Sequence, residues 1–241
     1  MTEAARKVRS LIARQAGDRA LFLQRARTVD TGSTSPDTRH ATWRLATLAG
    51  RLTELSSPGA AGLTLAFSLV LQAQQAEEPV GWLTTEASSF FPPDVEAFGI
   101  DLQALVVVRL PATGQIPRAA EHLARSGAFA LLVLDLVRDE DRPAQVPVPL
   151  QMRLLGLAQK HRIAVLCLTR KRAETPSLGS LVSLRAEAFR EQVGPDSELG
   201  DVDKREGGIS TFRCTAQILK DKRCGPGWTH SEVCRGPDGL C

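Results

Sequence analysis

The sequence contains no tyrosine, and its aromatic residues make up only 5% of 241 positions. A surface that stacks nucleic-acid bases on aromatic rings is therefore not expected. The sequence also has no large excess of positive or negative charge, because the formal net charge is only +3. Net charge alone therefore does not indicate a polyanionic partner.

Long apolar runs are missing as well. A run such as "AFALLVL" at 128–134 is far shorter than the ~20 residues that a membrane-spanning helix needs. The first residues, "MTEAARKVRSLIARQ", lack the continuous apolar stretch of a secretory signal. We therefore expect a soluble, cytoplasmic protein with no membrane partner.

Cysteine is present but is not arranged in pairs. The five cysteines form no C-x-x-C motif, which is the usual spacing of a structural zinc site. Cys224, His230 and Cys234 are too loosely spaced to indicate a metal. We expect reduced thiols, some of them buried in strands, and no metal site.

From residue 50 onward, apolar patterns typical of strands alternate with patterns typical of helices. The predicted strands are 50–55, 80–86, 104–110, 128–136 and 163–169, and the predicted helices are 63–76, 92–99, 117–127 and 149–161. The segments 181–191, 210–221 and 228–235 alternate apolar and polar residues and predict an antiparallel extension. The expected fold class is α/β, with a mostly parallel central sheet flanked by helices and an antiparallel C-terminal extension.

The first 28 residues differ from the rest of the chain. They carry seven Lys and Arg against two acids and read as a helical arm, with 29–241 as the core. The arm's apolar residues are Val8, Leu11, Ile12, Leu21 and Phe22. Two interpretations remain open: the arm covers its own core, or it docks on a partner or a second copy.

Residues 57–64, "SPGAAGLT", nearly match the phosphate-binding pattern G-x-x-x-x-G-K-[ST]. Gly62 and Thr64 fit the pattern, whereas Ser57 replaces its first glycine and Leu63 its lysine; Gly59 lies between them. One interpretation is a tight strand-to-helix turn. The other is a nucleotide loop that has lost its function.

Several stretches, in the right order, resemble RecA-type recombinases. They are "VDTGSTSPD" with "AGRLTELSSPGAAGLT", "TTE" at 84–86, the run 98–136, and "FRCTAQILKDKRCGPG" at 212–227. The resemblance covers about 29–241 and implies a RecA-like core.

The same resemblance implies roles for residues outside the loop. Glu86 matches the glutamate that activates the attacking water, and Asp135 matches the metal-linked acid. Lys220 and Lys222 match a pair that reaches nucleotide phosphate at the subunit interface. Without a lysine at position 63 these groups have little to act on. We therefore expect a vestigial nucleotide site with no catalytic residue and no cofactor.

The DNA-contacting loops of recombinases are shortened here. Arg170 also lies near the position of the glutamine that senses the γ-phosphate. Basic residues flank one predicted strand: Lys160, Arg162, Arg170, Lys171 and Arg172. They predict weak, salt-sensitive DNA binding without sequence preference, or simply a solvated basic edge.

A RecA-like chain with an altered loop and short DNA loops is similar to accessory proteins of the ImuA type. The resemblance implies a non-catalytic adaptor in damage-induced (SOS) mutagenesis and translesion DNA synthesis. Its implied partners are an inactive Y-family polymerase of the ImuB type and RecA, with self-association as a further possibility. The alternatives are a DNA-dependent ATPase or recombinase with a variant loop, and a modulator of RecA filaments.

Overall fold

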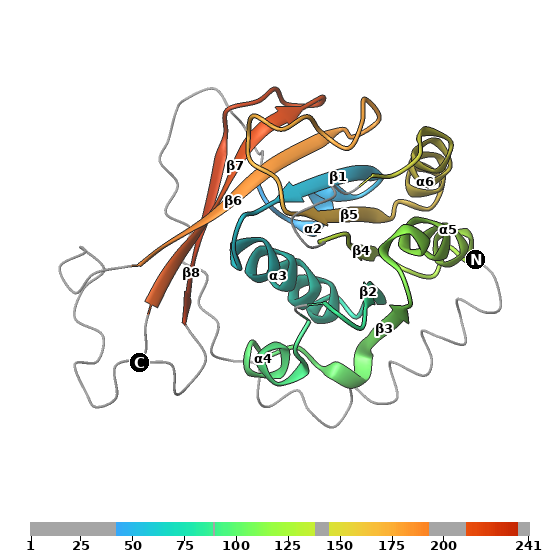
Figure 1. Ribbon diagram of the computed structural model, residues 1–241. Coiled ribbons are helices and arrows are strands. Elements are labelled where there is room, and N and C mark those ends of the chain that lie inside the picture. Colours follow the sequence, from blue (N-terminus) through green and yellow to red (C-terminus); the bar gives the residue numbers. More distant parts are fainter. Residues whose placement is uncertain (1–41, 89, 138–144, 193–210, 236–241) are drawn as a thin grey trace.

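The structure is a computed structural model that describes residues 42–88, 90–137, 145–192 and 211–235. The predicted arm at 1–28, with its five apolar residues, lies outside these ranges, so its role stays a prediction. In the described part of the chain, helices cover both faces of an eight-stranded sheet (Figure 1). The α/β fold class predicted from the sequence is confirmed.

The sheet has the order β3-β2-β4-β5-β1-β6-β7-β8. Its strands are β1 (Arg51–Ser56), β2 (Val80–Thr85), β3 (Leu105–Leu110), β4 (Leu131–Asp135), β5 (Ala164–Thr169), β6 (Leu184–Gln192), β7 (Thr211–Asp221) and β8 (Thr229–Arg235). The helices are α2 (Leu45–Leu48), α3 (Ala61–Gln75), α4 (Pro92–Ala97), α5 (Ile116–Arg125) and α6 (Val148–His161), with short 3₁₀ turns at Leu102–Ala104 and Thr113–Gln115. None of the described helices is long and apolar enough to cross a membrane.

The direction of β6 corrects one detail of the expected fold. The segment 181–191 was expected in the antiparallel extension, but β6 pairs in parallel with β1, with Thr53 opposite Leu184. Only β7 and β8 are antiparallel to their neighbours. The segment 170–183 returns the chain across the sheet without a helix. Period-two alternation is common to parallel and antiparallel strands, so the sequence pattern does not reveal direction.

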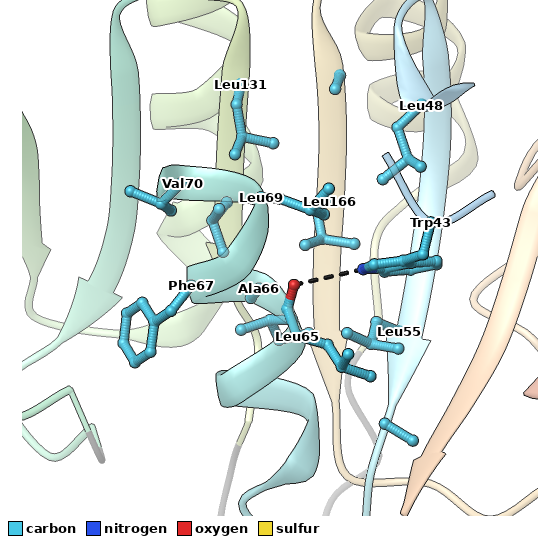
Figure 2. Packing of buried hydrophobic residues seen from close by; sticks show 14 of the residues in the cluster. Trp43, Leu48, Leu55, Leu65, Ala66, Phe67, Leu69, Val70, Leu131 and Leu166 are labelled. Atoms are coloured by element: carbon cyan, nitrogen blue, oxygen red, sulfur yellow. Dashed lines mark hydrogen bonds between the residues drawn. The ribbon is translucent and has the colours of Figure 1, made fainter. Parts of the chain in front are cut away.

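Two hydrophobic cores form, one on each face of the sheet. The larger one contains α3, which is apolar on most sides as predicted and buries nine of its residues. The other packs α5 and α6 against the opposite face. Trp43 belongs to the larger core, is fully buried, and donates from Nε1 to the carbonyl oxygen of Leu65 at 3.3 Å (Figure 2). The sequence patterns did not identify Trp43, because it lies outside any periodic segment.

Two cysteines are buried in strands, as expected. Cys167 in β5 and Cys214 in β7 are both buried and carry free thiols. Burial raises the pKa of the Cys167 thiol far above its ordinary range. This thiol is therefore held in its protonated form and packs in the core.

A buried ion pair ties the first strand to the last third of the chain. Arg51 Nη2 lies 2.5 Å from Asp221 Oδ1, and both side chains are at most 1% exposed. Arg51 also donates to the side-chain and backbone oxygens of Ser183, at 3.1 and 2.9 Å. Trp228 Nε1 donates to the second Asp221 oxygen at 3.3 Å. Burial alone would raise the pKa of Asp221, but the hydrogen bonds from Arg51 and the Arg223 N–H hold it below its ordinary value.

Replacing Arg51 by methionine should destabilise the protein by about 3–5 kcal/mol at pH 7, because it leaves the Asp221 carboxylate buried without a counterion. Chemical denaturation monitored by circular dichroism measures this loss. The control Arg109→Met, at an exposed arginine of the edge strand β3, should change stability by less than about 0.5 kcal/mol.

The same pair predicts a pH dependence with a defined sign. The folded-state pKa of Asp221 is depressed, so its contribution is fully present above the unfolded-state value near 3.8 and is lost as the pH falls through the folded-state value. The stability difference between wild type and Arg51→Met should therefore shrink below about pH 4. A difference that stays constant down to pH 2 would contradict this assignment.

Candidate functional site

The turn between β1 and α3 is built around the side chain of Ser57. The Ser57 N–H donates to the carbonyl oxygen of Thr169 at 3.0 Å, which fixes the turn to β5. Ser57 Oγ donates to the carbonyl oxygen of Gly59 at 2.9 Å and accepts from the Gly59 N–H at 3.2 Å. Serine commonly closes turns in this way. Its hydroxyl is therefore satisfied inside its own loop.

Ser57 also takes up space inside the loop. A Cβ placed on Gly62 would lie only 3.0 Å from the Cβ of Ser57, so Gly62 faces that side chain closely. In a phosphate-binding loop the interior is left to phosphate oxygens, which the backbone N–H groups cradle. Here the glycine makes room for the protein's own serine.

The start of α3 uses its polar groups locally. The N–H groups of Leu63 and Thr64 donate to the carbonyl oxygen of Ala60 at 3.0 and 3.2 Å. Thr64 Oγ1 lies 3.4 Å from the same oxygen. Leu63 is partly buried and packs against the larger core. Leu63, at the position where the loop pattern has lysine, thus packs against the core. The Thr64 hydroxyl points back along its own helix.

A small pocket remains beside this turn. It has a volume of about 170 Å³ and is lined by Leu55, Ser57, Gly59, Ala60, Gly62, Leu63, Val137, Leu168, Thr169 and Arg170. Pockets that enclose a drug-sized ligand typically measure about 300–1,000 Å³. The pocket is therefore smaller than this range. Arg170 is the one cationic side chain among its lining residues.

The two predicted carboxylates follow neighbouring parallel strands, at the end of the sheet that we call the carboxyl edge. Asp135 ends β4 and is 2% exposed. It accepts from Thr84 Oγ1 at 2.8 Å and from the Val137 N–H at 3.3 Å. Glu86 is exposed in the turn after β2. Within the described residues no three His, Cys, Asp or Glu side chains are grouped to hold a metal ion.

Lys220 and Lys222 do not line this pocket. They lie at the end of β7, which is antiparallel to β6 and finishes at the opposite end of the sheet, called here the amino edge. Lys222 Nζ donates to the carbonyl oxygen of Ser180 at 2.6 Å. Lys220 is partly buried, and this desolvation, together with the charge of Lys222, lowers the pKa of its amine.

Comparison with known proteins finds similarity over part of the chain. No protein-family model matches the chain. Similarity in sequence is to Protein RecA: 34% identity over 126 residues with that of Thermus aquaticus, covering 48% of this chain and 36% of that protein. With that of Clostridium beijerinckii it is 29% over 147 residues, covering 60% and 39%. The chain thus spans less than half the length of these relatives.

The fold also has a solved counterpart. A KaiC-like protein, PH0186 from Pyrococcus horikoshii, superimposes with a TM-score of 0.50 at 12% identity, covering 78% of this chain and 90% of that one. The fold is RecA-like. At this identity the superposition supports the architecture and carries nothing about activity.

The RecA-like sheet holds a buried carboxylate that sequence reasoning missed. Glu54 in β1 is fully buried. It pairs with Lys171 Nζ at 3.2 Å and accepts from Ser177 Oγ at 2.7 Å and from the Leu178 N–H at 2.9 Å. Arg185 Nε lies 4.0 Å away. Glu54 therefore fastens the segment 170–183 onto β1. The available signal was an acidic residue inside the apolar run "RLTEL".

This arrangement corrects the predicted DNA-contacting patch in two ways. Lys171 is only 7% exposed and is bound to Glu54, so it does not belong to an exposed basic edge. The other four residues are exposed but do not form one patch. Lys160 and Arg162 precede the six-residue strand β5, whereas Arg170 and Arg172 follow it. A strand of that length separates its ends by about 20 Å.

Replacing Glu54 by glutamine should destabilise the fold by about 3–5 kcal/mol, because Lys171 and Arg185 lose their counterion while remaining buried. Hydrogen exchange should rise in the segment 170–183. The control Glu121→Gln removes a carboxylate whose partners, Arg125 and Arg153, are 60% and 49% exposed. It should cost less than about 1 kcal/mol. Equal losses in the two variants would show that Glu54 is not a special anchor.

For nucleotide, we expect no measurable ATP hydrolysis and at most weak binding, because no lysine supplies charge to the phosphoryl group. Leu63→Lys alone should not restore binding, since Ser57 still fills the loop. Leu63→Lys combined with Ser57→Gly should bind Mg-ATP more tightly than either single variant in calorimetry. Robust turnover by the unaltered protein, abolished in Glu86→Gln, would contradict the expectation.

Proposed function

We propose that this protein is a non-catalytic, RecA-like accessory protein of the ImuA type that acts in damage-induced mutagenesis and translesion DNA synthesis. The observation that carries the proposal is the self-filled loop. Ser57 Oγ bonds twice to Gly59 where a nucleotide loop keeps its interior open. The RecA-like architecture is kept around it, as the similarity to RecA over part of the chain indicates.

The proposed role requires contact surfaces rather than a reaction centre. Its partners are an inactive Y-family polymerase of the ImuB type and RecA, with self-association as a further contact. The described fold supports this role through a well-anchored scaffold: buried ion pairs at Arg51 and Glu54 tie β1 to later segments of the chain. A scaffold of this kind presents loops and strand edges at fixed positions.

A second candidate is a DNA-dependent ATPase or recombinase with a variant loop. Glu86 and Asp135 favour it, because both lie at the carboxyl edge where such acids act. The proposed adaptor is favoured over it by Leu63, which packs into the core instead of supplying a cation. A modulator of RecA filaments is a third candidate, favoured by the partial similarity to RecA. Capture of RecA filaments without capture of the polymerase would distinguish it.

Deleting the arm tests the contact-based proposal directly. Removing residues 1–28 should leave the α/β core folded while weakening self-association or partner capture at least several-fold. A helix with a narrow apolar stripe gains its stability from what it packs against, and its basic residues suit an acidic surface. Thermal melting by circular dichroism tests the first half, and pull-down of purified ImuB-type polymerase and RecA, with and without ATP, tests the second.

Two outcomes would contradict this prediction. Failure of the truncated chain to fold would make the arm part of the core. Undiminished capture of every partner would place the contact surface elsewhere, with the segments 137–148 and 170–179 as the next to examine. A charge-matched control, in which the arm's apolar Val8, Leu11 and Ile12 become serine, separates its apolar stripe from its charge.

A further inference from the structure

The amino edge of the sheet gathers exposed cations from two distant segments. Lys160 and Arg162 stand at the end of α6, immediately before β5 begins. Lys222 and Arg223 stand in the turn after β7. All four side chains are exposed. The sequence predicted Lys160 and Arg162 as part of one group with the residues that follow β5, and Lys222 as a nucleotide contact.

The side chain of Arg223 and one backbone hydrogen bond bring these two segments together. The guanidinium Nη2 of Arg223 lies 3.5 Å from the carbonyl oxygen of Ala49. Gly50 lies between the two segments. A Cβ atom built on Gly50 would be 3.9 Å from Arg223 Nη2 and 3.8 Å from the Cα of Gln159. The Gly50 N–H in turn donates to the carbonyl oxygen of Ile163 at 3.1 Å. Arg223 therefore lies over the junction from which Lys160 and Arg162 project.

The edge is positive without local compensation. The segments that form it, 49–51, 158–163, 180–184 and 219–225, contain one acidic residue, Asp221. That carboxylate is buried and neutralised by Arg51. Within the described residues, none of the four exposed cations forms an ion pair with an acid. Their charges consequently act on whatever approaches from solvent.

The backbone at Arg162 adds an independent observation. Arg162 caps the C-terminus of α6 in the left-handed conformation, with φ of 58°. Glycine usually occupies this position, because a side chain is strained there. This conformation ends α6 at Arg162 and places its backbone directly after Lys160 and His161.

We propose that the amino edge, through Lys160, Arg162, Lys222 and Arg223, binds the phosphodiester backbone of a nucleic acid. Exposed Lys and Arg bind phosphates by releasing condensed counterions, and such contacts carry no base specificity. The absence of tyrosine and the low aromatic content of the sequence agree with binding through phosphates rather than through stacked bases.

An acidic protein surface is the less suitable partner. Protein interfaces depend on buried apolar or aromatic anchors near their centre. The exposed large apolar side chains among the described residues are Phe91, Val106, Val148, Met152 and Phe189, and none belongs to the segments of the amino edge. Phosphate contacts need no such anchor. The proposal does not depend on the adaptor role, because it concerns binding to nucleic acid alone.

Fluorescence anisotropy with a labelled 30-nucleotide single strand and the matching duplex, over a range of salt concentrations, tests the proposal on the full chain. The variant Lys160→Ala with Arg162→Gly should bind both more weakly. Its slope of log K against log salt should fall by about 1.4 for the single strand and about 1.8 for the duplex, the values for two lost phosphate contacts. Its melting temperature should be unchanged or higher, because glycine relieves the left-handed strain.

Matched variants decide the interpretation. Arg109→Ala with Arg118→Ala removes the same charge from exposed positions on β3 and α5 and should leave the slope unchanged. Arg162→Lys keeps charge and strain and should retain binding. If the Arg109 and Arg118 variant bound the oligonucleotide as weakly as the Lys160 and Arg162 variant does, the proposal would be overturned in favour of bulk charge. If Arg170→Ala with Arg172→Ala weakened binding more than the Lys160 and Arg162 variant does, it would be overturned in favour of the carboxyl edge. Displacement by polyglutamate as efficient as by unlabelled oligonucleotide would overturn it in favour of an acidic protein.

Discussion

The buried ion pair between Glu54 and Lys171 is the interaction on which the rest of this fold depends. Glu54 shares β1 with Arg51, three residues away, so the two buried charges project from opposite faces of the sheet. Each is compensated by the last third of the chain, Glu54 by Lys171 and Arg51 by Asp221. A buried charge without its partner is strongly destabilising. The Arg51–Asp221 pair therefore couples the stability of the parallel core to that of the C-terminal strands, although the sequence patterns present them as successive blocks.

The same strand leads into the loop that decides the chemistry. β1 is held on both sides by β5 and β6, so its last residue delivers Ser57 to a fixed position. What happens there depends on single side chains: Ser57 fills the loop and Leu63 packs into the core. The apolar pattern that produces the sheet does not depend on the identity of either residue. Fold and loop chemistry can therefore diverge, which is why a RecA-like architecture does not establish a RecA-like reaction.

The sequence predicted the elements well because their periodicity is local: α3 is apolar on most sides, and β4 is a continuous apolar run at the centre of the sheet. It did not predict features that depend on distant partners. Glu54 and Lys171 meet only after the segment 170–183 folds back. The direction of β6 depends on the same return path. The basic residues around β5 looked like one patch because they are close in sequence, yet a strand separates them in space.

The two ends of the sheet consequently differ in what they offer to solvent. Ligands of open α/β sheets usually bind at the carboxyl ends of the strands. At that edge of this protein Ser57 and Asp135 both bond within the chain, and the remaining pocket is about 170 Å³. At the amino edge the helix C-terminus of α6 would itself favour cations, but this dipole effect acts within one turn and does not account for Arg223, which arrives from β7. The convergence of cations from separate segments on one edge therefore reflects the tertiary fold rather than the capping of a helix.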